Sequence, residues 1–102
     1  MSGTETLLAA EARVPTAAAR RYLGQLCKHF RHKLPVEIEE SYGRIEFPAG
    51  VCELDAAAAG LLVLRVSAGE EEGLARLEEV VGRHLERFAF REEMKVSWKR
   101  AG

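Results

Sequence analysis

The sequence has few of the residues and patterns from which common catalytic sites are built. Its 102 residues include only two cysteines, three histidines and one tryptophan. Two cysteines are too few for an all-cysteine zinc or iron–sulfur site, which takes about four thiolates. The chain shows no phosphate-binding glycine loop, catalytic triad or pair of carboxylates at catalytic spacing. A plain enzyme without a cofactor is therefore the least favoured class.

Charge and hydropathy exclude further classes. The formal net charge of −1 lacks the basic excess that is usual in a nucleic-acid binder. No apolar run approaches the roughly 20 residues that span a bilayer, and no basic region precedes the short apolar run near the N-terminus. We therefore predict a cytoplasmic protein with Cys27 and Cys52 as free thiols. We also predict a single domain over residues 1–102, frayed at 1–4 and 101–102.

Alternating and helical apolar patterns follow one another along the chain. Strands are predicted at residues 5–13, 36–41, 44–47, 51–55, 61–66 and 94–99. One helix is predicted from Thr16, as N-cap, to about Lys33. A second begins after Ser67, where the tetrapeptide SAGE offers a capping box, and its apolar stripe ends at Phe88.

This order, β-α-β-β-β-β-α-β, predicts an α+β fold. It is a two-layer sandwich, with two helices packed on one face of a mostly antiparallel sheet. The other face carries the Glu and Lys positions of the strands. It would therefore meet either water or a second subunit, in a homodimer through the open sheet face.

The segment CKHFRHK, residues 27–33, holds most of the residues that are able to do chemistry. At about 100° per residue, Cys27 and His29 lie roughly 160° apart around the helix, so they cannot bind the same ion. His29 and His32 lie about 60° apart and could converge. A three-histidine metal site would form only if His84, on the second helix, met them.

Two glycines offer an alternative way for the helices to meet. Gly24 and Gly82 lie in the middle of the two predicted helices, on the flank opposite His29 and His84. Antiparallel helices could pack closely through these glycines, and the histidines would then be kept apart. The sequence leaves both arrangements open.

Cys27 has two interpretations. Arg31 lies one turn ahead of it, and a nearby guanidinium group lowers the pKa of a thiol, which would favour a reactive thiolate. The alternative is a small apolar residue at the edge of the helix core.

The strongest indication of a binding function in the sequence is a block of positive charge without acidic partners. Between Ala12 and Leu34 there is no Asp or Glu, but there are six basic residues: Arg13, Arg20, Arg21, Lys28, Arg31 and Lys33. A stripe opposite the core follows the helical spacing and consists of Arg21, Gln25, Lys28 and His32. Such a stripe would attract an anionic small ligand or an acidic protein partner. The alternative is a solvated face whose last charges complement the helix dipole.

Three blocks of the sequence carry a family resemblance: RYLGQLCKHFRHKLPVE (21–37), GRIEFPAGVCEL (43–54) and LEEVVGRHLERFAFREEMKVSW (77–98). With them the chain resembles the small bacterial family catalogued as domain of unknown function 2218. The resemblance implies no established activity. It does imply an association with siderophore-interacting flavoproteins, and so a role around siderophore and iron handling. The residues it singles out are Tyr22, Cys27, His29, His32, Cys52, His84, Arg87 and Phe88.

These observations favour a non-catalytic accessory or binding module whose first helix receives an anion or an acidic partner. The candidate binding residues are Arg21, Tyr22, Lys28, His29, Arg31, His32 and His84. One alternative is a metal- or haem-binding protein that uses His29, His32 and His84. Another is a thiol-based redox protein that uses Cys27. The identity of any cofactor is left unassigned.

Overall fold

The computed structural model describes residues 7–101 and contains two helices and six strands. The elements in chain order are β1 (Leu8–Pro15), α1 (Ala19–Arg31), β2 (Val36–Ile38), β3 (Tyr42–Phe47), β4 (Gly50–Asp55), β5 (Leu61–Ala68), α2 (Glu71–Phe88), the short 3-10 helix η1 (Phe90–Glu92) and β6 (Lys99–Arg100). The predicted order of strands and helices is confirmed.

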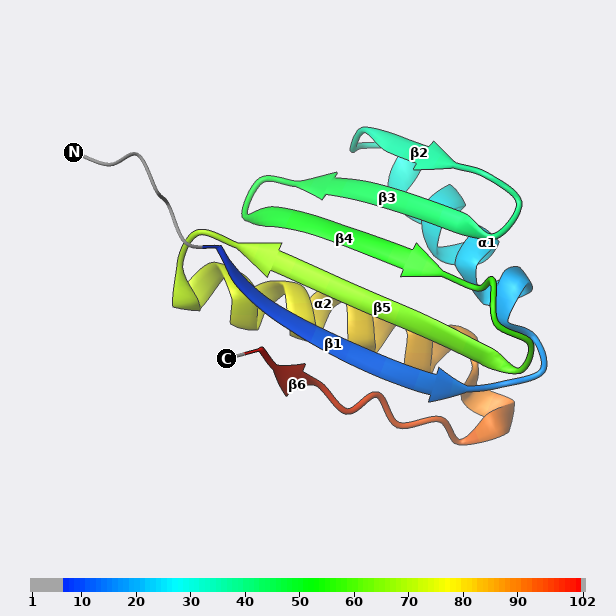
Figure 1. Ribbon diagram of the computed structural model, residues 1–102. Helices are drawn as coiled ribbons and strands as arrows, with labels where there is room; N and C mark the ends of the chain where they lie inside the picture. Colours follow the sequence, from blue (N-terminus) through cyan, green and yellow to red (C-terminus); the bar gives the residue numbers. More distant parts are fainter. Residues whose placement is uncertain (1–6, 102) are drawn as a thin grey trace.

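The six strands form one sheet in the order β2-β3-β4-β5-β1-β6. Every neighbouring pair is antiparallel. Both helices cover the same face of this sheet, α1 over the β2–β4 side and α2 over β5 and β1 (Figure 1). The α+β two-layer sandwich is therefore confirmed, and no helix formed by residues 7–101 covers the other face of the sheet.

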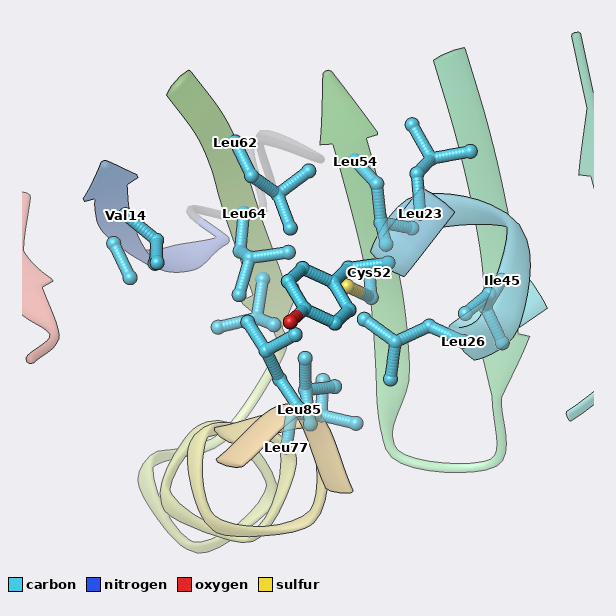
Figure 2. Packing of buried hydrophobic residues seen from close by; sticks show 14 of the residues in the cluster. Val14, Leu23, Leu26, Ile45, Cys52, Leu54, Leu62, Leu64, Leu77 and Leu85 are labelled. Carbon is cyan, nitrogen blue, oxygen red and sulfur yellow. The ribbon is translucent and has the colours of Figure 1, made fainter. Parts of the chain in front are cut away.

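Period-2 alternation in the strands and the helical stripes together build the core between the layers. Leu62 and Leu64 of β5 and Leu54 of β4 point toward the helices, and Leu26 and Leu85 meet them from α1 and α2 (Figure 2). All five leucines are fully buried. Such side chains contribute about 1.5–3 kcal/mol each when they leave water.

Both predicted helix starts are wrong. The N-cap of α1 is Ala18, which has no side-chain cap bond. Thr16 lies two residues earlier, where its hydroxyl accepts the Ala18 N–H at 3.1 Å and donates to Glu92 at 3.0 Å. Ser67 lies within β5, and Glu70 is the N-cap of α2 without a side-chain bond. The capping-box pattern was overridden because strand pairing extends β5 to Ala68.

The predicted strand at 94–99 is also largely wrong, since only Lys99–Arg100 pairs with β1. Residues 94–98 have no regular secondary structure. The alternating side chains of Met94, Val96 and Trp98 nevertheless pack against the core. Val96 donates its backbone N–H to the Glu86 carboxylate at 2.8 Å. One-sided burial produces the same alternation whether or not the segment has a strand partner. The first strand is shifted as well: it covers 8–15 rather than 5–13, and residues 5 and 6 lie outside the described part.

Candidate functional site

The helices meet through their histidines and not through their glycines. The ring centroids of His29 and His84 are 4.7 Å apart. Gly82 is covered by Trp98 and Val96, and the space beside Gly24 is open. The glycine-packing alternative is therefore wrong.

Phe30 and Phe88 contact the two histidine rings, and Phe47 packs on Phe30. Phe30 lies 5.0 Å from both His84 and Phe47, and Phe88 lies 5.8 Å from His29, all between ring centroids. We call these five side chains the His29–His84 cluster. It joins the last turn of α1, the last turns of α2 and the end of β3. Phe47 was not predicted as a site residue, because its sequence pattern predicts only a strand over residues 44–47.

The orientation of His84 is set by its own helix. Its Nδ1 lies 2.7 Å from the Val80 carbonyl oxygen. Because a carbonyl can only accept, Nδ1 carries the proton and donates to it. In the neutral ring, Nε2 is therefore left with a free lone pair that can accept a hydrogen bond or bind a metal ion.

His29 is held toward its neutral form. Contact with the neighbouring rings removes water from one side of it, and this desolvation lowers the pKa of His29. The positive charges of His84, His32, Arg87 and Lys33 lower that pKa further.

We expect this shift to make stability depend on pH. Because the folded state lowers the pKa of His29, the unfolded chain binds more protons below about pH 6.5. The full free energy of unfolding is therefore present at neutral pH, and part of it is lost as the pH falls through that region. Urea unfolding at about pH 7 and about pH 5 should show a smaller pH-dependent loss in His29→Asn than in the wild type. His32→Asn, as the control, should keep most of the wild-type dependence, because desolvation is the largest cause of the shift. An NMR titration that placed the pKa of His29 at or above its ordinary value would contradict the prediction.

His32 does not join the other two histidines. Within residues 7–101, no three His, Cys, Asp or Glu side chains come together in a way that could hold a metal ion. The structure thus brings together His29 and His84, two of the three predicted ligands. His32 is exposed and lines the surface beside them.

Two adjoining hollows lie on either side of His29. One, of about 510 Å³, is lined by His29, Phe30, His32, Lys33, Leu34 and Phe47. The other, of about 340 Å³, is lined by Gln25, Lys28, His29, His32 and Phe88. Because His29 and His32 line both, we treat them as one surface, the helix-end hollow. It combines an apolar floor with a basic rim.

The basic charge around this hollow is less uniform than the sequence indicated. Arg20 pairs with Glu40 at 3.2 Å. Arg21 lies over the Tyr22 ring, with its guanidinium carbon 5.5 Å from the ring centroid. Among the residues that the structure describes, no ion pair involves Lys28, Arg31 or Lys33. The uncompensated charge therefore gathers at the C-terminal end of α1.

Tyr22 is buried and acts as a tether. Its hydroxyl donates to Glu92 at 2.5 Å, and Thr16 donates to the same carboxylate. Glu92 thereby ties η1 to the start of α1. This hydrogen bond and burial raise the pKa of Tyr22. The sequence offered no signal for the role of Glu92 beyond its place in the third family block.

Both cysteines belong to the core. Cys27 is 1% exposed, and burial raises the pKa of its thiol to about 11, although Arg31 acts in the opposite direction. Burial also raises the pKa of Cys52, and both thiols are free. A reactive thiolate needs exposure and a lowered pKa, and neither cysteine has these properties.

The fold and the helix-end hollow define a small α+β sandwich with a basic, aromatic-lined surface where its two helices meet. The sequence matches, over residues 11–99, the family described as uncharacterized protein conserved in bacteria (DUF2218). The chain belongs to this family. The chain is similar to PA4090 from Pseudomonas aeruginosa, whose NMR structure is known, with 34% sequence identity. The two structures superpose with a TM-score of 0.77, and the match covers 90% of this chain and 95% of PA4090. No curated protein matches the sequence. Neither helix of residues 7–101 is both long and apolar enough to cross a membrane.

Proposed function

We propose that the protein is a non-catalytic binding module whose helix-end hollow receives an anionic ligand with an apolar or aromatic part. The observation that carries this proposal is the group of unpaired cations at the end of α1 beside a floor of phenylalanine rings. Lys28 and Lys33 would contact the anionic groups, and Phe30 and Phe47 would contact the apolar part.

Electrostatics decide between an anion and a cation at this place. The C-terminal carbonyls of α1 oppose an anion by about 0.3–1 kcal/mol. Lys28 and Lys33 line the hollow, and Arg87 lies close enough to His29 to lower its pKa. Each of these three charges favours an anion. Three full charges outweigh the half-charge of one helix end.

A ferric siderophore is one ligand with this combination of properties. It is a metal complex that can carry negative charge, and many such ligands present aromatic or apolar groups. The association implied by the family resemblance points in the same direction. We place this role in the cytoplasm, where the free thiols of Cys27 and Cys52 would stay reduced.

Binding of a gallium-loaded tris-catecholate siderophore, which is diamagnetic, can be followed by chemical-shift changes. We expect shifts at residues 28–34, 47 and 88, and about tenfold weaker binding in Lys33→Glu, a loss of about 1.4 kcal/mol. Arg76→Glu makes the same change of charge on the exposed side of α2 and should bind as the wild type does. Chemical-shift changes confined to other residues, or an equal loss of affinity in both variants, would contradict the proposal.

A second candidate function, a site for a transition-metal ion, is favoured by the tautomer of His84. Histidines that bind metals generally donate their other ring nitrogen to a carbonyl or carboxylate, as His84 does to Val80. His29 and His84 would supply two ligands. Titration with Zn²⁺ or Cu²⁺ should then broaden or shift both rings in the wild type, but not in His84→Asn. His32→Asn should behave as the wild type. An unchanged spectrum at millimolar metal would exclude this candidate.

A further inference from the structure

A row of charged residues crosses the open face of the sheet. The strand registers align Glu11 with Lys99 and Arg65, and Arg65 with Glu53. They also align Arg44 with Glu53 and with Glu37. Each strand contributes one residue to this charge ladder, which in sheet order reads Lys99, Glu11, Arg65, Glu53, Arg44 and Glu37.

The ladder lies on the face opposite the helices. Strand neighbours of its members, such as Ala10, Leu64 and Cys52, are buried under the helices, and successive side chains alternate between faces. Glu11 keeps 32% and Arg65 keeps 55% of its side-chain surface exposed. These groups are therefore available to a partner on the open face.

The signs alternate along the ladder and are antisymmetric about the line between β5 and β4. A half-turn about an axis parallel to the strands on this line maps each charge onto one of opposite sign. Arg65 would then face Glu53 of a second copy, Glu11 would face Arg44, and Lys99 would face Glu37. A half-turn about an axis across the strands would put like charges together.

The neighbouring rows agree with the same half-turn. The registers place Arg13, Val63, Asp55 and Tyr42 in one row. The half-turn would bring the Arg13 guanidinium opposite the Tyr42 ring and Val63 opposite Asp55. On the other side of the ladder, Ser67 and Val51 would face each other. No like charges meet in either row.

We propose that the open face is where two copies of this chain associate, about a two-fold axis that runs parallel to the strands between β5 and β4. Its occupant is a second copy because the ladder is its own complement. The face covers roughly 600 Å² per copy at ordinary strand spacings, below the about 800 Å² per partner of a standard interface. The dimer is therefore weak, and added salt weakens it further.

Within one chain the ladder charges also contact one another, as Arg65 does Glu11 at 2.7 Å. A test must separate this lateral pairing from pairing between copies. Arg65→Glu places two negative charges at the centre of the ladder, and Glu53→Arg places two positive ones. Each variant alone repels its own copy, whereas the two variants are complementary to each other.

Sedimentation velocity at low ionic strength should show a concentration-dependent dimer for the wild type and monomers for each variant alone. An equimolar mixture of the two variants should form a dimer again. Arg83→Glu, on α2, should dimerise as the wild type does. A wild type that is monomeric at millimolar concentration, variants that still dimerise alone, or a mixture that stays monomeric would overturn the proposal.

A second pair of substitutions avoids the centre of the sheet. Glu37 and Lys99 lie on opposite edge strands, so no lateral contact links them within one chain. Glu37→Lys or Lys99→Glu should weaken the dimer at least threefold, and the double variant should restore it. Equal weakening in the double variant would contradict the proposed axis. The helix-end hollow lies on the other layer, so this result is independent of any failure to bind a ligand there.

Discussion

Replacing Gly50 by alanine is expected to lower the free energy of unfolding by about 3 kcal/mol or more. A Cβ atom at this position would lie 2.0 Å from the Ser67 carbonyl oxygen and 3.0 Å from the Ala68 Cα atom. Both atoms belong to the backbone of β5, the neighbouring strand in the middle of the sheet. Because a paired backbone cannot move aside cheaply, β4 and β5 would have to separate locally.

Urea denaturation followed by circular dichroism would measure this loss. Gly24→Ala is the matched control, because its Cβ would meet nothing within 4 Å. In the middle of α1 it should raise stability by up to about 1 kcal/mol. A Gly50→Ala protein within about 0.5 kcal/mol of the wild type would show that the strands have more room here than the structure indicates.

Truncation of Leu26 to alanine is expected to cost about 2–5 kcal/mol of stability. Leu26 is fully buried and points from α1 into the space between the sheet and α2 (Figure 2). Its removal would leave a cavity at the centre of the core, on the helix that also carries His29 and Lys28. The midpoint of urea unfolding should fall accordingly.

Leu26→Met is the control for this truncation, because it nearly conserves volume and should cost less than about 1.5 kcal/mol. Comparing the two variants also tests whether ligand binding depends on the packing of α1. A ligand that binds Leu26→Met normally but Leu26→Ala weakly would show that the hollow depends on the position of α1. Similar stability for both variants would contradict the packing described for this residue.

Much of the fold could be predicted because each strand and helix has its own local pattern. In the strands predicted at 44–47 and 51–55, Ile45, Cys52 and Leu54 alternate with charged residues, and all three are buried. The order of elements then left few ways to arrange two helices on an antiparallel sheet. Local patterns failed at the ends of elements, where Thr16 bonds to a residue 76 positions away.

The geometry between elements could not be predicted from either element alone. Helix periodicity placed His29 and Gly24 on different flanks, but only the packing of the helices on the sheet decided which flank faces α2. Cys27 was expected at the edge of the core and is instead buried. The cause lies on β3, where a Cβ on Gly43 would come within 2.5 Å of the Cys27 sulfur. A glycine on a strand of the sheet thus leaves the space in which this thiol, on α1, is buried.

The place of β1 in the sheet has a consequence for how the chain folds during synthesis. Its neighbours are β5 and β6, and Glu11 contacts Arg65 across 54 residues of chain. The β2–β5 strands, in contrast, join through short connections and can pair as soon as they are made. The first strand to leave the ribosome therefore waits for residues 61–68 before it can pair. Closing that long loop is the slow, high-contact-order step in forming the sheet.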